Sequence, residues 1–215
     1  MDTRRWLPLS GLVFVIIALV AVVALGGDTP DSTTPGAEVA SFYDDEQTQQ
    51  VIGAFVWVAS IPFLVFFAVA VAAFARSAEA RTVWGYVVVG GSVMLGAILA
   101  LLSAVQFAMT DGATNDISPA SLEALNLIVG NGWVAFNGAL GVMMLGAAGC
   151  LLSANRYRWL GWVALVLGVA LFIPFADFVA LIVSLIWIIV VSVLLFRAAP
   201  PSGSAVSGTT ALGDA

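Results

Sequence analysis

The segment from Trp159 to Phe196 reads WLGWVALVLGVALFIPFADFVALIVSLIWIIVVSVLLF, and Asp177 is its only charged residue. As one straight helix these 38 residues would measure about 57 Å, whereas the hydrocarbon core of a bilayer is about 30 Å thick. Pro174 disfavours a helical conformation at the residue before it, and Asp is favoured at the start of a helix. We therefore expect a tight hairpin between two helices, which cover 159–173 and 178–196.

Four further apolar runs precede this segment, and each is long enough to cross a membrane. The chain is 61% hydrophobic and only 9% charged, whereas soluble domains carry about 25% charged residues. We therefore expect an all-α fold, a polytopic six-helix transmembrane bundle that forms one domain over residues 1–197. Residues 198–215 are rich in Pro, Ser, Gly and Thr, which predicts a disordered cytoplasmic tail. The first four spans are expected at about 6–25, 50–75, 83–109 and 122–153.

The basic residues support this count, because all seven are arginine and they fall on one side of a six-span topology. The positive-inside rule makes that side the cytoplasm, whereas most of the acids fall on the other side. An odd number of spans would divide the arginines between the two sides. We therefore predict a multi-pass protein of the cell inner membrane with its N- and C-termini in the cytoplasm. The arginines are Arg4, Arg5, Arg76, Arg81, Arg156, Arg158 and Arg197.

The first apolar run has an alternative interpretation as a secretory signal peptide. Arg4 and Arg5 precede it, and Ala24-Leu25-Gly26 resembles a small-residue cleavage site. Its apolar length of about 19 residues exceeds the roughly 7–15 residues of the apolar core of such a signal, which favours a retained span. Both interpretations leave the other five spans unchanged.

Several kinds of chemistry are excluded by residues that the chain lacks. Without Lys it cannot form a Schiff base with retinal or pyridoxal phosphate, and without His it lacks the usual ligands of haem and many metals. Cys150 is its only cysteine. Asp177 and Glu123 are both expected at the outer edge of the membrane, so no ionisable residue is expected near mid-bilayer. We therefore predict no enzyme activity, no catalytic residue, no cofactor and no metal.

A polar face is expected on the fourth span, together with one amide of the third span. Spacings of four, three, four and four residues place its members on one side of a helix. Amides in a membrane seek hydrogen bonds across helices, so the face has two interpretations. It packs the helices together, or it forms the polar wall of a small pocket or pore. The members are Asn126, Gly130, Trp133, Asn137 and Gly141, with Gln106 from the third span.

Small residues recur at every fourth position of the third span. Such a stripe allows two helix backbones to approach closely. We expect it to bury the third and fourth spans inside the bundle, and contact with a second copy of the chain is the alternative use. The stripe consists of Ser92, Gly96, Ala100 and Ala104.

Two signals predict helix starts outside the membrane. The stretch Ser41-Phe42-Tyr43-Asp44 has the pattern of a capping box, which would place the acidic residues 44–46 in the first turn of a helix. After a short loop from Thr110 to Pro119, Ser118 is expected to cap a helix that has proline at its first position.

The stretch AEVASFYD at 37–44 is followed by GAF at 53–55, and RWLGW at 158–162 is followed by LVLG at 165–168. Both patterns resemble small six-span membrane proteins of unknown function from high-GC bacteria, often actinobacteria. The resemblance extends over nearly the whole chain and implies six spans in a bacterial inner membrane. It implies no activity and no catalytic residue.

Two functional hypotheses follow from the missing chemistry and the polar face. The first is an accessory or scaffold protein that acts through helix packing and partner interactions. The alternative is a channel or carrier for a small neutral or apolar solute that uses the asparagine face. The expected partners are the lipid bilayer and either another membrane protein or a second copy of the chain, and no nucleic acid is expected.

Overall fold

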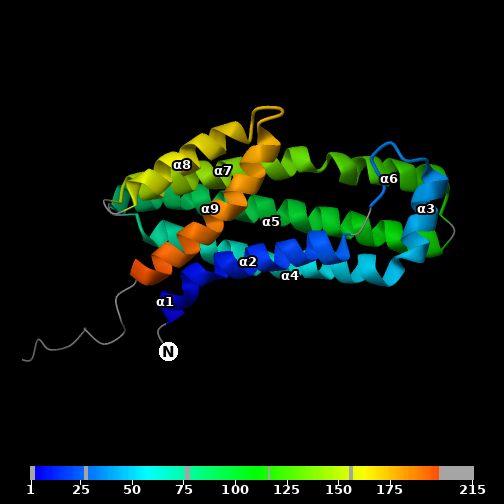
Figure 1. Cartoon of the computed structure of the whole chain (residues 1–215), viewed down its shortest axis with the longest axis horizontal. Coiled ribbons are helices and arrows are strands. Elements are labelled where there is room, and N and C mark those ends of the chain that lie inside the picture. The colour runs from blue at the N-terminus through cyan, green and yellow to red at the C-terminus, as the bar shows by residue number, and fades with distance from the viewer. Residues whose placement is uncertain (1–2, 27–28, 76–77, 116, 155–156, 199–215) are drawn as a thin grey trace, which may run out of the picture.

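The computed structural model describes residues 3–26, 29–75, 78–115, 117–154 and 157–198. Figure 1 shows an elongated bundle in which the long helices run roughly side by side. No strand occurs within those ranges, so the predicted all-α helical bundle is confirmed. The elements are α1 Thr3–Trp6, η1 Leu7–Leu9, α2 Ser10–Leu19, η2 Val20–Leu25, α3 Gly36–Asp45, α4 Gln47–Ala73, α5 Ala78–Thr114, α6 Pro119–Asn131, α7 Trp133–Leu152, α8 Arg158–Ala170 and α9 Asp177–Ala198.

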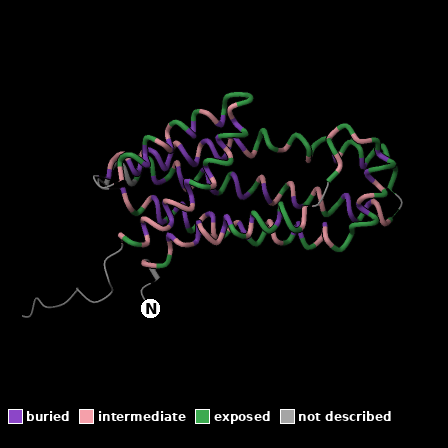
Figure 2. Tube along the Cα trace, viewed as in Figure 1, coloured by how far each residue is buried: buried purple, intermediate pink, exposed green. Residues whose placement is uncertain are grey.

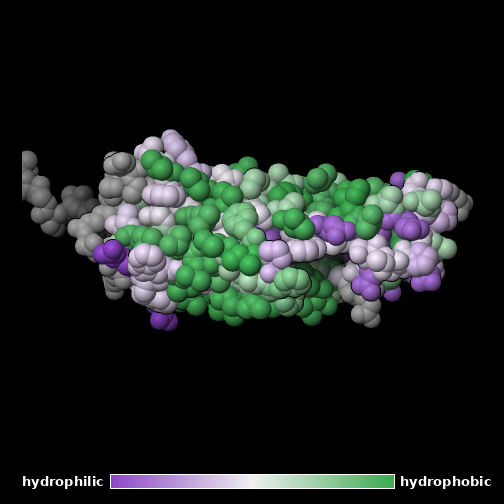
Figure 3. Space-filling model, turned by 90° about the horizontal axis from the view of Figure 1, so that it is seen from above, coloured by the Kyte–Doolittle hydropathy of each residue, from purple (hydrophilic) through white to green (hydrophobic). Residues whose placement is uncertain are grey.

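Five segments of the described chain are long and apolar enough to cross a membrane, which identifies a membrane protein. The sixth apolar helix, α8, has 13 residues and a length of about 20 Å, so by itself it is too short for a core of about 30 Å. Figure 3 shows apolar surface over the middle of the bundle and hydrophilic residues gathered toward its ends. The five segments are Leu7–Leu25, Gln47–Ala73, Thr82–Thr114, Pro119–Leu152 and Asp177–Ala198.

The two ends of the bundle differ in charge. One end holds α1, the start of α8 with Arg158 and the end of α9 with Arg197, and we call it the basic end (Figure 1). The opposite, acidic end holds α3 and the start of α4, where the side chains of residues 44–46 are exposed carboxylates. Both ends of the described chain thus lie at the basic end, as a six-span topology requires. Arg76, Arg156 and the predicted tail beyond residue 198 lie outside the described residues.

The basic half of the bundle is closely packed, and buried residues concentrate there in Figure 2. Helices α5 and α7 meet backbone to backbone. A Cβ added at Gly91 would lie 2.5 Å from the backbone nitrogen of Met143, and one added at Gly146 would collide with the backbone of Val88. Only glycine allows so close an approach, and a large apolar cluster that includes Cys150 surrounds the contact.

Helix α3 lies across the acidic end instead of continuing α4 (Figure 1). The chain turns at Glu46, which lies between the two helices with φ −102° and ψ 19°. The prediction of a capping box at Ser41 is wrong, because α3 already begins at Gly36, directly after Pro35. Ser41 lies in the middle of α3, and residues 44–46 lie at its C-terminal end rather than in a first turn.

The predicted boundaries near the acidic end shift by several residues. Helix α5 continues to Thr114, so much of the expected loop from Thr110 to Pro119 is helical. The expected span 122–153 begins earlier and is interrupted at Gly132, between α6 and α7. The predicted cap at Ser118 is confirmed, because its Oγ accepts the N–H of Ser121 at 3.4 Å.

Helices α8 and α9 form a hairpin whose turn lies about midway along the bundle (Figure 1). Helix α8 ends at Ala170, and Phe175 in the turn has a positive φ of 69°. The indole N–H of Trp187 donates to the carbonyl of Leu160 at 3.1 Å and joins the two helices. The predicted turn at Pro174 is confirmed, but its tip lies deeper in the bundle than expected, because α8 is so short.

Gly90 and Gly91 are neighbours with opposite surroundings, so they provide a matched test of this packing. A Cβ at Gly90 would meet nothing within 4 Å, whereas one at Gly91 would press on the backbone of Met143. We expect Gly91→Ala to lower the free energy of unfolding by about 1–3 kcal/mol. Gly90→Ala should leave it unchanged or raise it by up to about 1 kcal/mol, because Ala favours helix. Unfolding of the purified variants in detergent measures both, and equal stabilities would contradict the close contact.

Candidate functional site

Three neighbouring cavities occupy the middle and the acidic half of the bundle. We call them the capped chamber, the middle chamber and the side pocket, with volumes of about 320, 300 and 250 Å³. Trp57, Gln106 and Val129 line both the capped and the middle chamber. Trp133 lines both the middle chamber and the side pocket. The three cavities therefore follow one another from α3 to the middle of the bundle.

The capped chamber lies at the acidic end and has amides in its wall. Gln106 Nε2 donates to Gln50 Oε1 at 2.7 Å, and Asn126 Nδ2 donates to the carbonyl of Asp31 at 2.7 Å. An amide can form more hydrogen bonds than these, so the wall can also bind a polar group of a solute. The lining residues are Ala21, Val22, Gly26, Thr29, Pro30, Tyr43, Gly53, Trp57, Gln106, Asn126, Val129 and Gly130.

Helix α3 is held over this chamber by a polar and an apolar contact. The N–H of Gly36, the first residue of α3, donates to Glu123 Oε2 of α6 at 3.1 Å. A carboxylate at this position is favoured, because the N-terminus of a helix carries partial positive charge. On the apolar side, α3 contributes two residues to a small buried cluster formed by Val39, Tyr43, Met109 and Leu122.

The middle chamber is mainly apolar. Trp57, Trp133 and Phe136 provide aromatic walls, and Ser103 and Gln106 are the polar residues that line it. Trp133 lines this chamber and is 49% exposed, so it lies at the open side of the chamber and not in the packed core.

The side pocket contains a buried carboxylate. Asp177 Oδ2 accepts a hydrogen bond from Asn137 Nδ2 at 3.1 Å, and Asp177 Oδ1 accepts the N–H of Phe178 at 2.9 Å. Asn137 is 3% exposed and Asp177 is 7% exposed. Within the described residues, Oδ1 of Asn137 is buried without a hydrogen-bond partner. The pair therefore has more free acceptors than donors, because one of the two N–H groups of Asn137 Nδ2 already donates to Asp177.

The contacts between helices establish the height of this pair in the bundle. Because α5 and α7 are antiparallel and Gly91 meets Met143, Asn137 is level with a point about six residues beyond Gly91. At that level Gly96 of α5 meets Ile61 of α4. Asn137 is therefore level with the middle of α4.

Ile61 is remote from charge in both directions along the chain. The nearest charged residues in the sequence are Glu46 and Arg76, each 15 positions away, and α4 itself carries no charged residue from Gln47 to Ala73. A hydrocarbon core of about 30 Å between these charges has its centre near Ile61 and hence near the Asn137–Asp177 pair. Asp177 therefore lies near the middle of the apolar length of the bundle and not at its acidic end, where an outer-edge position would have placed it.

The predicted polar face is divided among the three cavities. Asn126, Gly130 and Gln106 line the capped chamber, and Trp133 and Asn137 line the side pocket. Gly141 lies outside these walls, where an added Cβ would meet the ring of Phe172 at 2.6 Å. Helical spacing brought these residues to one side despite the interruption at Gly132.

Sequence reasoning missed three side chains of these cavities. Gln50 is the partner of Gln106, Tyr43 lines the capped chamber from α3, and Asp177 is the partner of Asn137. Asp177 offered a signal, because it is the only charged residue in 38 apolar positions. Its partner lies 40 residues away, and no local pattern connects the two.

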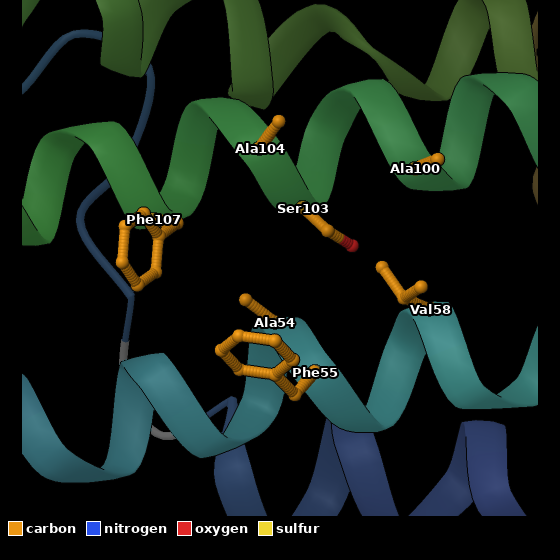
Figure 4. Close-up of a pocket in the computed structure, with 7 residues that line it drawn as sticks. All are labelled: Ala54, Phe55, Val58, Ala100, Ser103, Ala104 and Phe107. Atoms are coloured by element: carbon orange, nitrogen blue, oxygen red, sulfur yellow. The ribbon is translucent and has the colours of Figure 1, made fainter.

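The predicted small-residue stripe of α5 faces α4. Ser92 is buried, and a Cβ added at Gly96 would lie 2.6 Å from the side chain of Ile61. Ala100 and Ala104 line a groove of about 220 Å³ between α5 and α4, and Figure 4 shows Phe55 and Phe107 among its other lining residues. Ser103 is the only polar residue in this groove, so it offers little for chemistry.

Comparisons of the chain with protein families, with characterised proteins and with solved structures give no match. The resemblance to six-span proteins of high-GC bacteria therefore stays a prediction. Among the described residues, no group of three or more Cys, Asp or Glu side chains is placed to hold a metal ion. The candidate site is thus defined by its geometry alone, as a row of cavities with amides and one carboxylate.

Alkaline titration provides a test of the cap. Burial raises the pKa of the Tyr43 phenol from 10.0 to about 12. The folded cap favours the neutral phenol, so its contribution to stability is complete below pH 10 and is lost as the pH rises through about 12. We expect ultraviolet titration in detergent to show a tyrosine that ionises near pH 12, and Tyr43→Phe to remove this step. Tyr86→Phe, at an exposed position, is the control and should leave it in place.

Proposed function

We propose that this membrane protein binds and carries a small, mainly apolar solute, which it takes up at the acidic end of the bundle. The observation that supports this is the capped chamber and the middle chamber, which share Trp57, Gln106 and Val129 as lining residues. The two chambers adjoin one another at these residues, whereas α5 packs closely on α7 in the basic half. Chambers that end inside the bundle favour a binding protein or carrier over an open channel.

The walls indicate the chemistry of the solute. Trp57, Trp133 and Phe136 favour an apolar or aromatic body, and the amides of Gln106 and Asn126 can bind one neutral polar group. A volume of about 300 Å³ in each chamber suits a molecule of few heavy atoms.

Transport assays test this proposal. We expect vesicles that contain the protein to take up indole or benzyl alcohol faster than protein-free vesicles. Leu at both Gln106 and Asn126 should reduce this excess by about tenfold, the size expected for loss of hydrogen bonds in a desolvated site. Gly90→Leu, on an open face of α5, is the matched control and should leave uptake unchanged. Equal uptake by the double variant and the wild type would refute the role of these amides.

We further propose that the protein resides in a bacterial inner membrane with its basic end in the cytoplasm. The asymmetry that supports this orientation is arginine at one end and exposed carboxylates at the other. In a Cys150→Ala background, the variant Asp44→Cys should react with a membrane-impermeant maleimide on intact spheroplasts. The variant Ser202→Cys should react only after lysis. The reverse result would invert the orientation.

The accessory or scaffold role predicted from the sequence is the second proposal. The feature that favours it is the apolar groove between α4 and α5, because Ala100 and Ala104 leave room there for a helix of another membrane protein or of a second copy (Figure 4). The prediction that the chain is not an enzyme belongs with both proposals.

A further inference from the structure

We propose that the side pocket is a binding site for lipid-soluble primary amines, which reach it from the bilayer at mid-membrane depth. The site is centred on Asp177 and Asn137 and goes beyond the neutral-solute chambers at the acidic end. It rests on the hydrogen-bonding inventory of the pair, on its missing counter-charge and on the shape of the pocket.

The hydrogen bonds of the pair leave acceptors unused. Asn137 Nδ2 is engaged by Asp177 Oδ2, and Asp177 Oδ1 holds the N–H of Phe178. Each carboxylate oxygen can accept more than one hydrogen bond, and Asn137 Oδ1 has no partner among the described residues. One N–H of Asn137 Nδ2 also remains, but the unused acceptors outnumber it, so the wall favours a ligand that donates hydrogen bonds.

Among the described residues, no arginine side chain is placed to balance the charge of Asp177, which lies in the first turn of α9, where the helix N-terminus supplies only a partial positive charge. Arg158 and Arg197 lie at the basic end, and Arg197 is 20 residues from Asp177, about 30 Å along α9. Ionisable side chains at membrane depth are rare, and they pair with an opposite charge or mark a functional site. An ammonium group supplies both the missing charge and, with three N–H groups, the missing donors. A hydroxyl supplies one donor and no charge, so the pocket favours an amine over an alcohol.

The walls of the pocket indicate the rest of the ligand and its route. Val134, Phe172 and Ile173 line the pocket and are each at least half exposed on the apolar belt of the bundle. Gly138 also lines it, and a Cβ added there would meet nothing within 4 Å. The pocket therefore has free space beside Gly138 and an apolar rim, and its volume of about 250 Å³ suits an alkyl or aromatic body. Lipid-facing residues at this rim make the bilayer, rather than water, the route of access.

Photolabelling with a matched pair of probes tests the site. The probes are a long-chain alkylamine that carries a diazirine and the alcohol with the same skeleton, each added to the full chain in lipid vesicles. We expect the amine to label the segments 133–138 and 171–177, and an excess of unlabelled alkylamine to suppress this labelling. The alcohol should label them about tenfold less, as expected when a charge-assisted hydrogen bond is lost.

Two variants and one control separate the carboxylate from the cavity. Asp177→Asn removes the charge with little change in shape and should reduce amine labelling about tenfold. Gly138→Leu fills the pocket while leaving Asp177 in place, and it should reduce labelling by both probes. Gly90→Leu adds the same side chain at another open position and should change neither.

Specific outcomes would overturn the proposal. Equal labelling by amine and alcohol, or full amine labelling of Asp177→Asn, would show that the carboxylate of Asp177 does not contribute to amine binding. If Asp177→Asn fails to fold, undiminished labelling of Gly138→Leu would refute the pocket on its own. Uptake of indole or benzyl alcohol should persist in Gly138→Leu, so failure of this site and failure of the neutral-solute chambers are distinguishable.

Discussion

The backbone contact between α5 and α7 governs where everything else in the bundle lies. At Gly91 and Gly146 the two helices touch without intervening side chains, and the basic half of the protein packs solidly around this contact. Toward the acidic end side chains lie between the helices, because a Cβ added at Gly132 would meet the side chain of Leu102 of α5 at 2.6 Å. A Cβ at Gly138 would meet nothing within 4 Å, and Trp133, just over one turn earlier in α7, lines two cavities. The basic half is solid and the acidic half contains cavities because glycines bring the backbones of α5 and α7 together only in the basic half.

The depth of Asp177 is a consequence of the length of α8. This helix begins with Arg158 at the basic end and advances only about 20 Å in its 13 residues, so α9 must begin near the middle of the bundle. Irregular backbone at membrane depth is tolerated where its polar groups find partners. The turn meets this condition in part, because the N–H groups of Ala176 and Asp177 both donate to the carbonyl of Ile173.

Hydropathy predicted the helices well because burial in lipid requires long apolar runs, and the ends of α4, α7 and α9 agree with the expected spans within a few residues. What failed depends on contacts between distant segments. The pattern at Ser41 obeys a local rule, yet α3 begins at Gly36, whose N–H is held by Glu123, 87 residues away. Proline and aspartate located the hairpin along the chain, and the few residues between Arg158 and Pro174 already indicate that its tip cannot reach the far end of the bundle.

The two interpretations of the polar face, helix packing and a polar cavity wall, are compatible for most of its amides, and Asn137 is the exception. Gln106 and Asn126 each use an amide donor to join two segments, and both also line a cavity. For these residues, helix packing and a place in a cavity wall go together. Asn137 instead holds a carboxylate and leaves its own Oδ1 unpaired, and a buried unpaired acceptor costs about 1–3 kcal/mol. The carboxylate of Asp177 is favoured in the first turn of α9, so the feature that packing leaves unexplained is the unpaired Oδ1 of Asn137.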